Sequence, residues 1–217
     1  MPTAVITSVT GTTELNCINT FITLTATGGV SYSWSNGLGN NANATVTNPG
    51  TYSVTVTASN GCSATTDIQI TENLDVPNAG IVNNSNTTVL TCTQPSISLT
   101  ATGGTSYSWN SGLGNVAAVN VGAAGNYIVT VTGANGCSTT AQIDITASSD
   151  LPVASIQNNT GQTMLDCNTT QINLQAQGGG TYSWNNGLGN NQSVNIVSHG
   201  TYTVTVTGSN GCSASSQ

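Results

Sequence analysis

The chain has 217 residues, no lysine or arginine, seven aspartates and glutamates, and a formal net charge of −7. Nucleic-acid backbones and anionic lipid headgroups attract proteins mainly through basic side chains, so this composition excludes both as partners. The sequence contains no apolar run long enough to span a bilayer, and we expect no membrane insertion.

The sequence repeats with a fixed period of 75 residues. The anchors of the first copy and their counterparts in the next two are Cys17, Trp34 and Cys62, then Cys92, Trp109 and Cys137, then Cys167, Trp184 and Cys212. A constant period without insertions predicts a tandem array of small units. We assign Ig-like repeats to residues 1–75, 76–150 and 151–217, the last with a truncated final strand. The chain is thus expected to be a window of a longer array.

The first half of each copy shows strand signals in chain order. In the first copy, a short apolar run at residues 4–6 is followed by a polar turn and by residues 15–17. Residues 22–27 then alternate between apolar side chains and threonine, the period of a half-buried strand. Gly28 and Gly29 predict a turn that uses positive φ. Tyr32 and Trp34 share the inner face of the next strand.

The second half of each copy predicts a brief strand at residues 44–47 and a longer one at residues 52–57. Asn-Gly at position 60 is a strong hairpin signal, and the return strand carries Ile68 and Ile70 inward. Six or seven short strands per copy, with no helical period, predict an all-β fold: a tandem array of three Ig-like β-sandwich domains. Short linkers with prolines predict copies stacked end to end.

The recurring motifs resemble the Ig-like/PKD-like repeats of Bacteroidota cell-surface proteins. As they read in the first copy, these motifs are Thr-Leu-Thr-Ala-x-Gly-Gly, Tyr-Ser-Trp, Gly-Thr-Tyr-x-Val-Thr-Val-Thr and Asn-Gly-Cys. The resemblance covers the whole chain and implies a gliding-motility or type IX-secreted adhesin that is extracellular and exposed at the cell surface. One departure is clear: residues 34–39 read Trp-Ser-Asn-Gly-Leu-Gly where the PKD signature has Trp-x-Phe-Gly-Asp-Gly.

The six cysteines predict disulfides in an oxidising compartment. Two pairings remain open. One joins cysteines of the same copy, and the other joins successive copies; the latter leaves two cysteines for neighbouring repeats. We favour the same-copy pairing, because a bridge inside each small domain stabilises it where its core is limited. The two sets are Cys17–Cys62, Cys92–Cys137 and Cys167–Cys212, or Cys17–Cys137 and Cys92–Cys212.

The aromatic residues are predicted core anchors, because their strand parity matches that of the apolar residues. They are Trp34, Trp109, Trp184, Tyr52, Tyr127 and Tyr202. The alternative is a surface platform that stacks on sugars. We also expect the third copy to be less stable than the others, since it lacks counterparts of Ile68 and Ile70.

No catalytic, metal or cofactor site is predicted. His199 is the only histidine and sits in a turn without a partner. Asp75 and Asp150 recur just before linker prolines, where a turn role is more typical than the several converging carboxylates that calcium prefers. We therefore predict a structural protein and not an enzyme.

The predicted function is a structural repeat segment of an extracellular stalk, filament or adhesin that extends from the cell surface. Its expected partners are neighbouring repeats of the same or a longer chain, with self-association into filaments. An ice-binding module is an alternative, because outward threonines at positions 23, 25 and 27 form a row. Sheet twist works against a flat lattice match for such a row.

Overall fold

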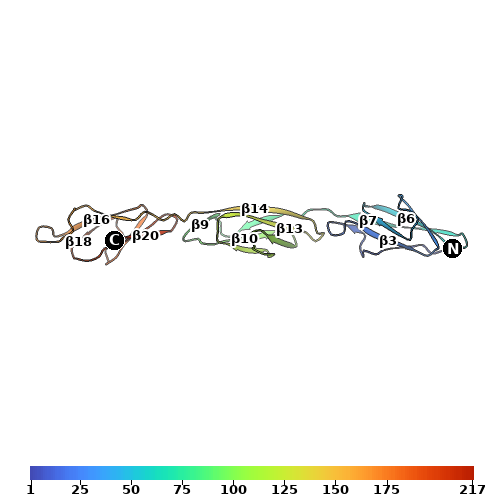
Figure 1. Cartoon of the computed structure of the whole chain (residues 1–217), viewed down its shortest axis with the longest axis horizontal. Helices are drawn as coiled ribbons and strands as arrows, with labels where there is room; N and C mark the ends of the chain where they lie inside the picture. Colours follow the sequence, from blue (N-terminus) through green and yellow to red (C-terminus); the bar gives the residue numbers. More distant parts are fainter. The chain divides into compact units, whose positions relative to one another are not determined.

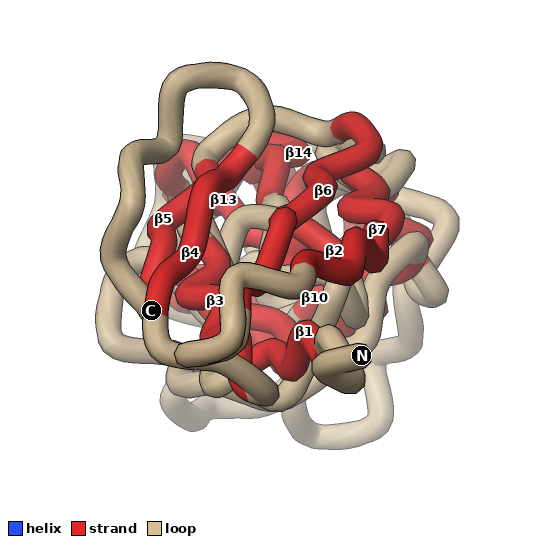
Figure 2. Tube along the Cα trace, turned by 90° about the vertical axis from the view of Figure 1, so that its right-hand side faces the viewer, coloured by secondary structure: helices blue, strands red, loops and turns tan.

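The computed structural model describes residues 1–217, and it consists of strands and loops without a helix (Figure 2). The all-β prediction is therefore confirmed. No helix long and apolar enough to cross a membrane occurs in the chain.

The first copy forms seven strands in two sheets, and β6 and β7 lie side by side in Figure 1. The three-stranded sheet has the order β1-β3-β5, with β1 (Val5–Ser8), β3 (Ile22–Thr27) and β5 (Asn43–Val46). The four-stranded sheet has the order β2-β7-β6-β4, with β2 (Glu14–Leu15), β7 (Ser63–Glu72), β6 (Gly50–Thr57) and β4 (Ser31–Trp34).

Every pairing in the first copy is antiparallel except one, in which β2 runs parallel to the end of β7. The inward residues of both sheets form one core. Its fully buried aliphatic members are Ile22, Leu24, Val46, Val54, Val56 and Ile70. These positions follow the period-two pattern of the sequence, because successive side chains of a strand point to opposite faces.

The turn after β3 requires glycine at both positions, because other backbone segments pack closely against it. Gly28 has φ +109°, and a Cβ there would overlap the carbonyl oxygen of Thr3. A Cβ on Gly29 would lie 2.6 Å from the carbonyl oxygen of Thr57. A side chain at Gly28 would therefore displace the backbone at Thr3, and one at Gly29 would displace the end of β6 at Thr57.

The second copy repeats the seven-stranded arrangement. Its sheets have the orders β12-β10-β8 and β11-β13-β14-β9. The strands are β8 (Gly80–Asn83), β9 (Val89–Leu90), β10 (Ile97–Thr102), β11 (Ser106–Trp109), β12 (Ala118–Val121), β13 (Gly125–Thr132) and β14 (Ser138–Ala147).

The third copy has six strands in two three-stranded sheets, β15-β16-β18 and β17-β19-β20. It has no counterpart of β2, and its last two strands are short. The strands are β15 (Ser155–Asn158), β16 (Ile172–Gln177), β17 (Thr181–Trp184), β18 (Ser193–Ile196), β19 (Val204–Thr207) and β20 (Ser213–Ser216).

Two compact units divide the chain, and they do not follow the repeat boundaries. The first consists of Met1–Ile81, Ala101–Ala117 and Ile128–Gln142. The second consists of Val82–Thr100, Ala118–Tyr127 and Ile143–Gln217. Each unit therefore contains one complete copy together with part of the second copy. The three domain boundaries drawn from the repeat stay a prediction.

Candidate functional site: the junctions between copies

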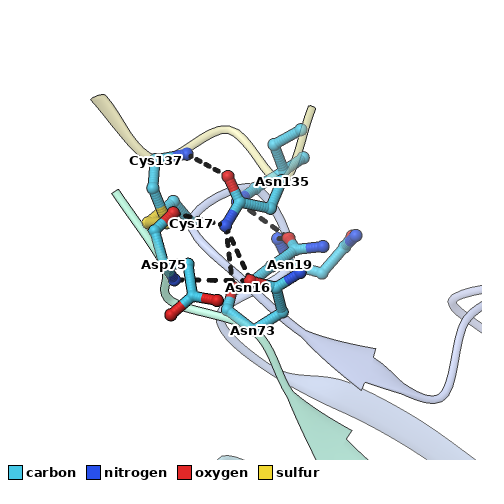
Figure 3. Close-up of a disulfide and its surroundings, with 8 residues drawn as sticks. Asn16, Cys17, Asn19, Asn73, Asp75, Asn135 and Cys137 are labelled. Atoms are coloured by element: carbon cyan, nitrogen blue, oxygen red, sulfur yellow. Dashed lines mark hydrogen bonds between the residues drawn. A yellow bond between two sulfur atoms is a disulfide. The ribbon is translucent and has the colours of Figure 1, made fainter. Parts of the chain in front are cut away.

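The cysteines join successive copies. Cys17 is bonded to Cys137, with Cα atoms 5.0 Å apart, within the first compact unit (Figure 3). Cys92 is bonded to Cys212 with the same Cα separation of 5.0 Å, within the second unit. Both bridges close the same sequence separation of 120 residues. The two junctions therefore have the same disulfide connection between equivalent cysteines.

The favoured same-copy pairing of Cys17–Cys62, Cys92–Cys137 and Cys167–Cys212 is wrong. The short strand β2 precedes Cys17 and pairs with the far end of β7, which places Leu15 opposite Glu72. Cys62 precedes the other end of β7. The ten residues of β7 thus separate the two thiols, a distance of about 30 Å at the rise of an extended strand. A disulfide requires Cα atoms within roughly 7 Å.

In each bridge, an asparagine two residues before the hairpin cysteine, Cys137 or Cys212, holds the linker. In the first junction, the Asn135 side-chain amide donates to the carbonyl oxygen of Asn73 at 3.2 Å and to that of Asp75 at 2.8 Å (Figure 3). The Asn135 side-chain oxygen accepts from the backbone N–H of Cys137 at 3.2 Å. One side chain therefore connects the hairpin that carries the disulfide to the linker of the preceding copy. We call this arrangement the asparagine clamp.

The second junction reproduces the asparagine clamp. The Asn210 amide donates to the carbonyl oxygens of Ser148 at 3.1 Å and Asp150 at 2.9 Å. The Asn210 oxygen accepts from the N–H of Cys212 at 3.1 Å. The bonds to Asn73 and Ser148 are part-buried and those to Asp75 and Asp150 are exposed. Because hydrogen bonds are directional, they orient the linker in addition to the covalent link. Sequence reasoning missed this role, because Asn-Gly was interpreted only as a hairpin turn.

Asp75 and Asp150 of the linkers contribute to the asparagine clamp through backbone hydrogen bonds and not through their carboxylates. Asp75 accepts from Asn135 with its carbonyl oxygen, and its own N–H donates to Asn73 Oδ1 at 3.3 Å. Asp150 accepts from Asn210 in the same way. The structure holds no group of three or more His, Cys, Asp or Glu side chains placed to hold a metal ion.

The six predicted anchor aromatics lie in the interior of their copies. Trp34, Trp109 and Trp184 are 6%, 5% and 5% exposed. Each indole N–H donates to a backbone carbonyl seven residues ahead, at 2.9, 3.0 and 2.9 Å. Tyr52 and Tyr127 are buried and Tyr202 is half-buried, with each hydroxyl donating to a carbonyl four residues back. A buried indole face offers no platform for stacking on a sugar.

A cavity of about 650 Å³ opens at one end of the third copy. Its lining includes Leu165, Ile172, Ile196, Tyr202 and the exposed His199. In the first copy the corresponding space is closed by Ile70, which is 0% exposed. His199 has no hydrogen-bonded partner there, and nothing around it forms an acid–base pair.

Residues 6–71 match the PKD domain. The match spans the first copy, and the second and third copies repeat its strand order with the changes described above. No curated protein sequence matches the chain.

One similar solved structure is an adhesin described as Ca²⁺-stabilized, which helps an Antarctic bacterium reach out and bind ice. It has 13% identity and a TM-score of 0.59, with 99% of this chain and 72% of that chain covered. A 1.5-MDa bacterial ice-binding adhesin aligns at 13% identity over 99% of this chain and 95% of the other, with a TM-score of 0.47. At such identity the first likeness establishes the shared fold, a tandem array of Ig-like β-sandwiches.

Proposed function

We propose that the chain is a structural, non-enzymatic repeat segment of an extracellular stalk, filament or adhesin that extends from a cell surface. The observation that carries the proposal is the covalent tie from each copy to the next, Cys17–Cys137 and Cys92–Cys212. A bridge within a copy would serve the stability of that copy. A bridge between copies fixes one copy on the next, as an array that transmits mechanical force along its length requires.

Two further features support this proposal. The asparagine clamp fixes the linker to the following hairpin in both junctions, so the copies are held by directional bonds as well as by sulfur. The first copy matches the PKD domain, and the structural neighbour with the same fold is an adhesin. That neighbour is described as Ca²⁺-stabilized, whereas the junction contacts of this chain are a disulfide and an amide.

We also propose an extracellular location, at the surface of a bacterium of the Bacteroidota type. Disulfides persist in oxidising compartments and are rare in the cytosol, which supports export. The motif set Tyr-Ser-Trp, Gly-Thr-Tyr and Asn-Gly-Cys supports the narrower assignment to surface repeats of gliding or type IX-secreted proteins.

Small-angle scattering tests the stalk proposal. Three sandwich domains stacked end to end, each about 35–45 Å long, should give a maximum dimension of roughly 110–130 Å. A maximum dimension of about 60 Å, expected when strands of this length form a single globule, would contradict it. The measurement is made under oxidising conditions, and a matched sample with Cys17→Ser and Cys92→Ser reports how much of the extension depends on the bridges.

Ice binding is the second candidate, because outward threonines form rows on two strand pairs. Their hydroxyls bond across strands, with Thr55 and Thr65 3.0 Å apart. The row of β3 is not kept in the third copy, where β16 presents Asn173, Gln175 and Gln177. Thermal hysteresis in dilute solution would support an ice-binding face. Its absence, with an intact fold by circular dichroism, would leave the structural role alone.

A further inference from the structure

Two cysteines are unpaired and exposed, Cys62 and Cys167. They are the two halves of the junction that already occurs twice in the chain. Cys62 corresponds to Cys137 and Cys212, the hairpin cysteines, whereas Cys167 corresponds to Cys17 and Cys92, their partners. We propose that two copies of this chain join head to tail through a disulfide from Cys167 of one to Cys62 of the other.

The hairpin half of the new junction is already formed around Cys62. The N–H of Cys62 donates to Asn60 Oδ1 at 3.1 Å, compared with 3.2 Å at Cys137 and 3.1 Å at Cys212. The Cys62 carbonyl accepts from the N–H of Ala58 at 2.9 Å, and the two equivalent bonds are 2.8 and 2.9 Å. The backbone of the unpaired hairpin therefore has the geometry of the paired ones.

The other half is formed around Cys167. Asp166 Oδ1 accepts from the N–H groups of Asn168 and Thr169 at 2.8 and 2.7 Å. Asn16 Oδ1 makes the same two bonds beside the bonded Cys17, at 3.0 and 2.8 Å. Side chains of this type fix a turn by bonding to the backbone two and three residues ahead. The loop that presents Cys167 thus needs no rearrangement to present its sulfur.

The surroundings of one glycine distinguish the hairpin of the unpaired Cys62 from the hairpins of the bonded Cys137 and Cys212. A Cβ at Gly136 would collide with Ile18, and a Cβ at Gly211 would collide with Thr93, because the loop of the preceding copy packs on that face. Gly61 has the same positive φ, +82°, and nothing lies within 4 Å of its Cβ position. The residue equivalent to Ile18 and Thr93 beside Cys167 is Asn168. Asn168 of one chain therefore packs on Gly61 of the next chain in the proposed junction.

The bond forms by thiol–disulfide exchange with a small disulfide such as oxidised glutathione. The Cys167 thiolate attacks one sulfur of glutathione disulfide, forming a mixed disulfide and releasing one glutathione thiolate. The Cys62 thiolate of the second chain then attacks the Cys167 sulfur and displaces the second glutathione. Two protein thiols are oxidised and one glutathione disulfide is reduced to two glutathiones, which take up the two protons.

The test uses two full-length variants, Cys62→Ser and Cys167→Ser, each with a single free thiol. One is labelled uniformly with ¹⁵N so that mass spectrometry distinguishes the three possible dimers. Both are mixed in equal amounts in a glutathione redox buffer. We expect the mixed dimer to form at least about tenfold faster than either homodimer, because docking raises the effective concentration of the correct thiol pair. Mixed dimers at the statistical half of the total would overturn the proposal.

A second variant separates docking from thiol reactivity. Gly61→Asn is placed in the Cys167→Ser chain, because asparagine tolerates positive φ and its side chain occupies the face reserved for Asn168. We expect the rate of mixed-dimer formation to fall to that of the homodimers, while the reaction of Cys62 with a small aromatic disulfide is unchanged. An unchanged mixed-dimer rate would show that Gly61 is not part of the contact and would overturn the proposal.

Discussion

The first and third copies share a sequence pattern but differ at one end of the core. In the first copy, the end of β7 lies between β2 and β6, and Leu15 and Ile70 are 2% and 0% exposed. In the third copy, β20 stops at Ser216, and the segments that would flank its continuation are not strands. Leu165 is half-buried and borders a cavity of about 650 Å³.

The difference shows that the end of β7 organises its neighbours as well as covering the core. Gly50 pairs with Ile70 and Tyr52 with Ile68, which makes β6 eight residues long. The equivalent β19 has only four residues and begins at Val204. A central strand supplies backbone hydrogen-bond partners on both sides. Without it, the adjoining ends of the flanking strands lose these partners and are no longer strands.

The largest effect is expected from restoring the missing strand. Appending Ile-Gln-Ile-Thr-Glu, the sequence of residues 68–72, after Gln217 should close the third copy. At the equivalent positions of the first copy Ile70 is fully buried and Ile68 is half-buried, so the two added isoleucines should contribute about 2–4 kcal/mol. Hydrogen exchange of residues 200–203 should slow strongly. The matched control appends Thr-Gln-Thr-Thr-Glu, which can pair but brings no large apolar side chain. Equal protection by both would mean that the isoleucines do not fill the cavity.

The reverse change should open the first copy. Ile70→Ala removes a fully buried side chain and should destabilise the first copy by about 2–5 kcal/mol. Hydrogen exchange in β6 and β2 is the readout, since both pair with β7. Gln69→Ala, at the exposed neighbouring position, serves as the control and should change little. Comparable losses in both variants would contradict the central place given to Ile70.

A smaller contrast is expected at the leucine that precedes the bridged cysteine. Leu15→Ala should cost about 2–4 kcal/mol because Leu15 is buried, whereas Leu165→Ala should cost clearly less, about 1 kcal/mol, because its site is already open. Denaturant unfolding followed by tryptophan fluorescence compares the two variants. Equal costs would show that Leu165 is as well packed as Leu15.

The smallest contrast is expected at the tryptophans, where the two copies are alike. Trp34 and Trp184 donate to backbone carbonyls at the same distance of 2.9 Å and are 6% and 5% exposed. Trp34→Phe and Trp184→Phe each lose this bond, at a cost of about 1–3 kcal/mol. The two losses should agree within error in local hydrogen exchange. A much smaller cost at Trp184 would mean that the open end loosens the whole third core.

The sequence predicted those features that depend on local periodicity. The alternation of apolar and polar residues located β3 and β6 and their inward faces, and the parity of Trp34 and Tyr52 placed both in the core. At the glycine pair of positions 28 and 29 the sequence predicted a turn that uses positive φ, and Gly28 has φ +109°. Such features are properties of a single strand or turn.

The cysteine pairing could not be predicted in the same way, because it depends on which strand β2 joins. Two residues, Glu14 and Leu15, decide this by pairing parallel to the last residues of β7. No period marks a two-residue strand. The asparagine clamp was missed for a related reason: Asn135 and Asn210 satisfy a local turn, and their second role involves carbonyls 60 residues earlier in the chain.

The two bridges overlap in sequence, and this overlap limits how far the molecule can be pulled. With both disulfides intact, the shortest covalent path from end to end follows residues 1–17, crosses to Cys137, returns to Cys92, crosses to Cys212 and ends at Gln217. Even a fully unfolded chain would then extend only about 230–250 Å, whereas the reduced chain would reach about 720–780 Å. Two thirds of the polypeptide would carry no tension, so the oxidised chain would act as a tether of fixed reach.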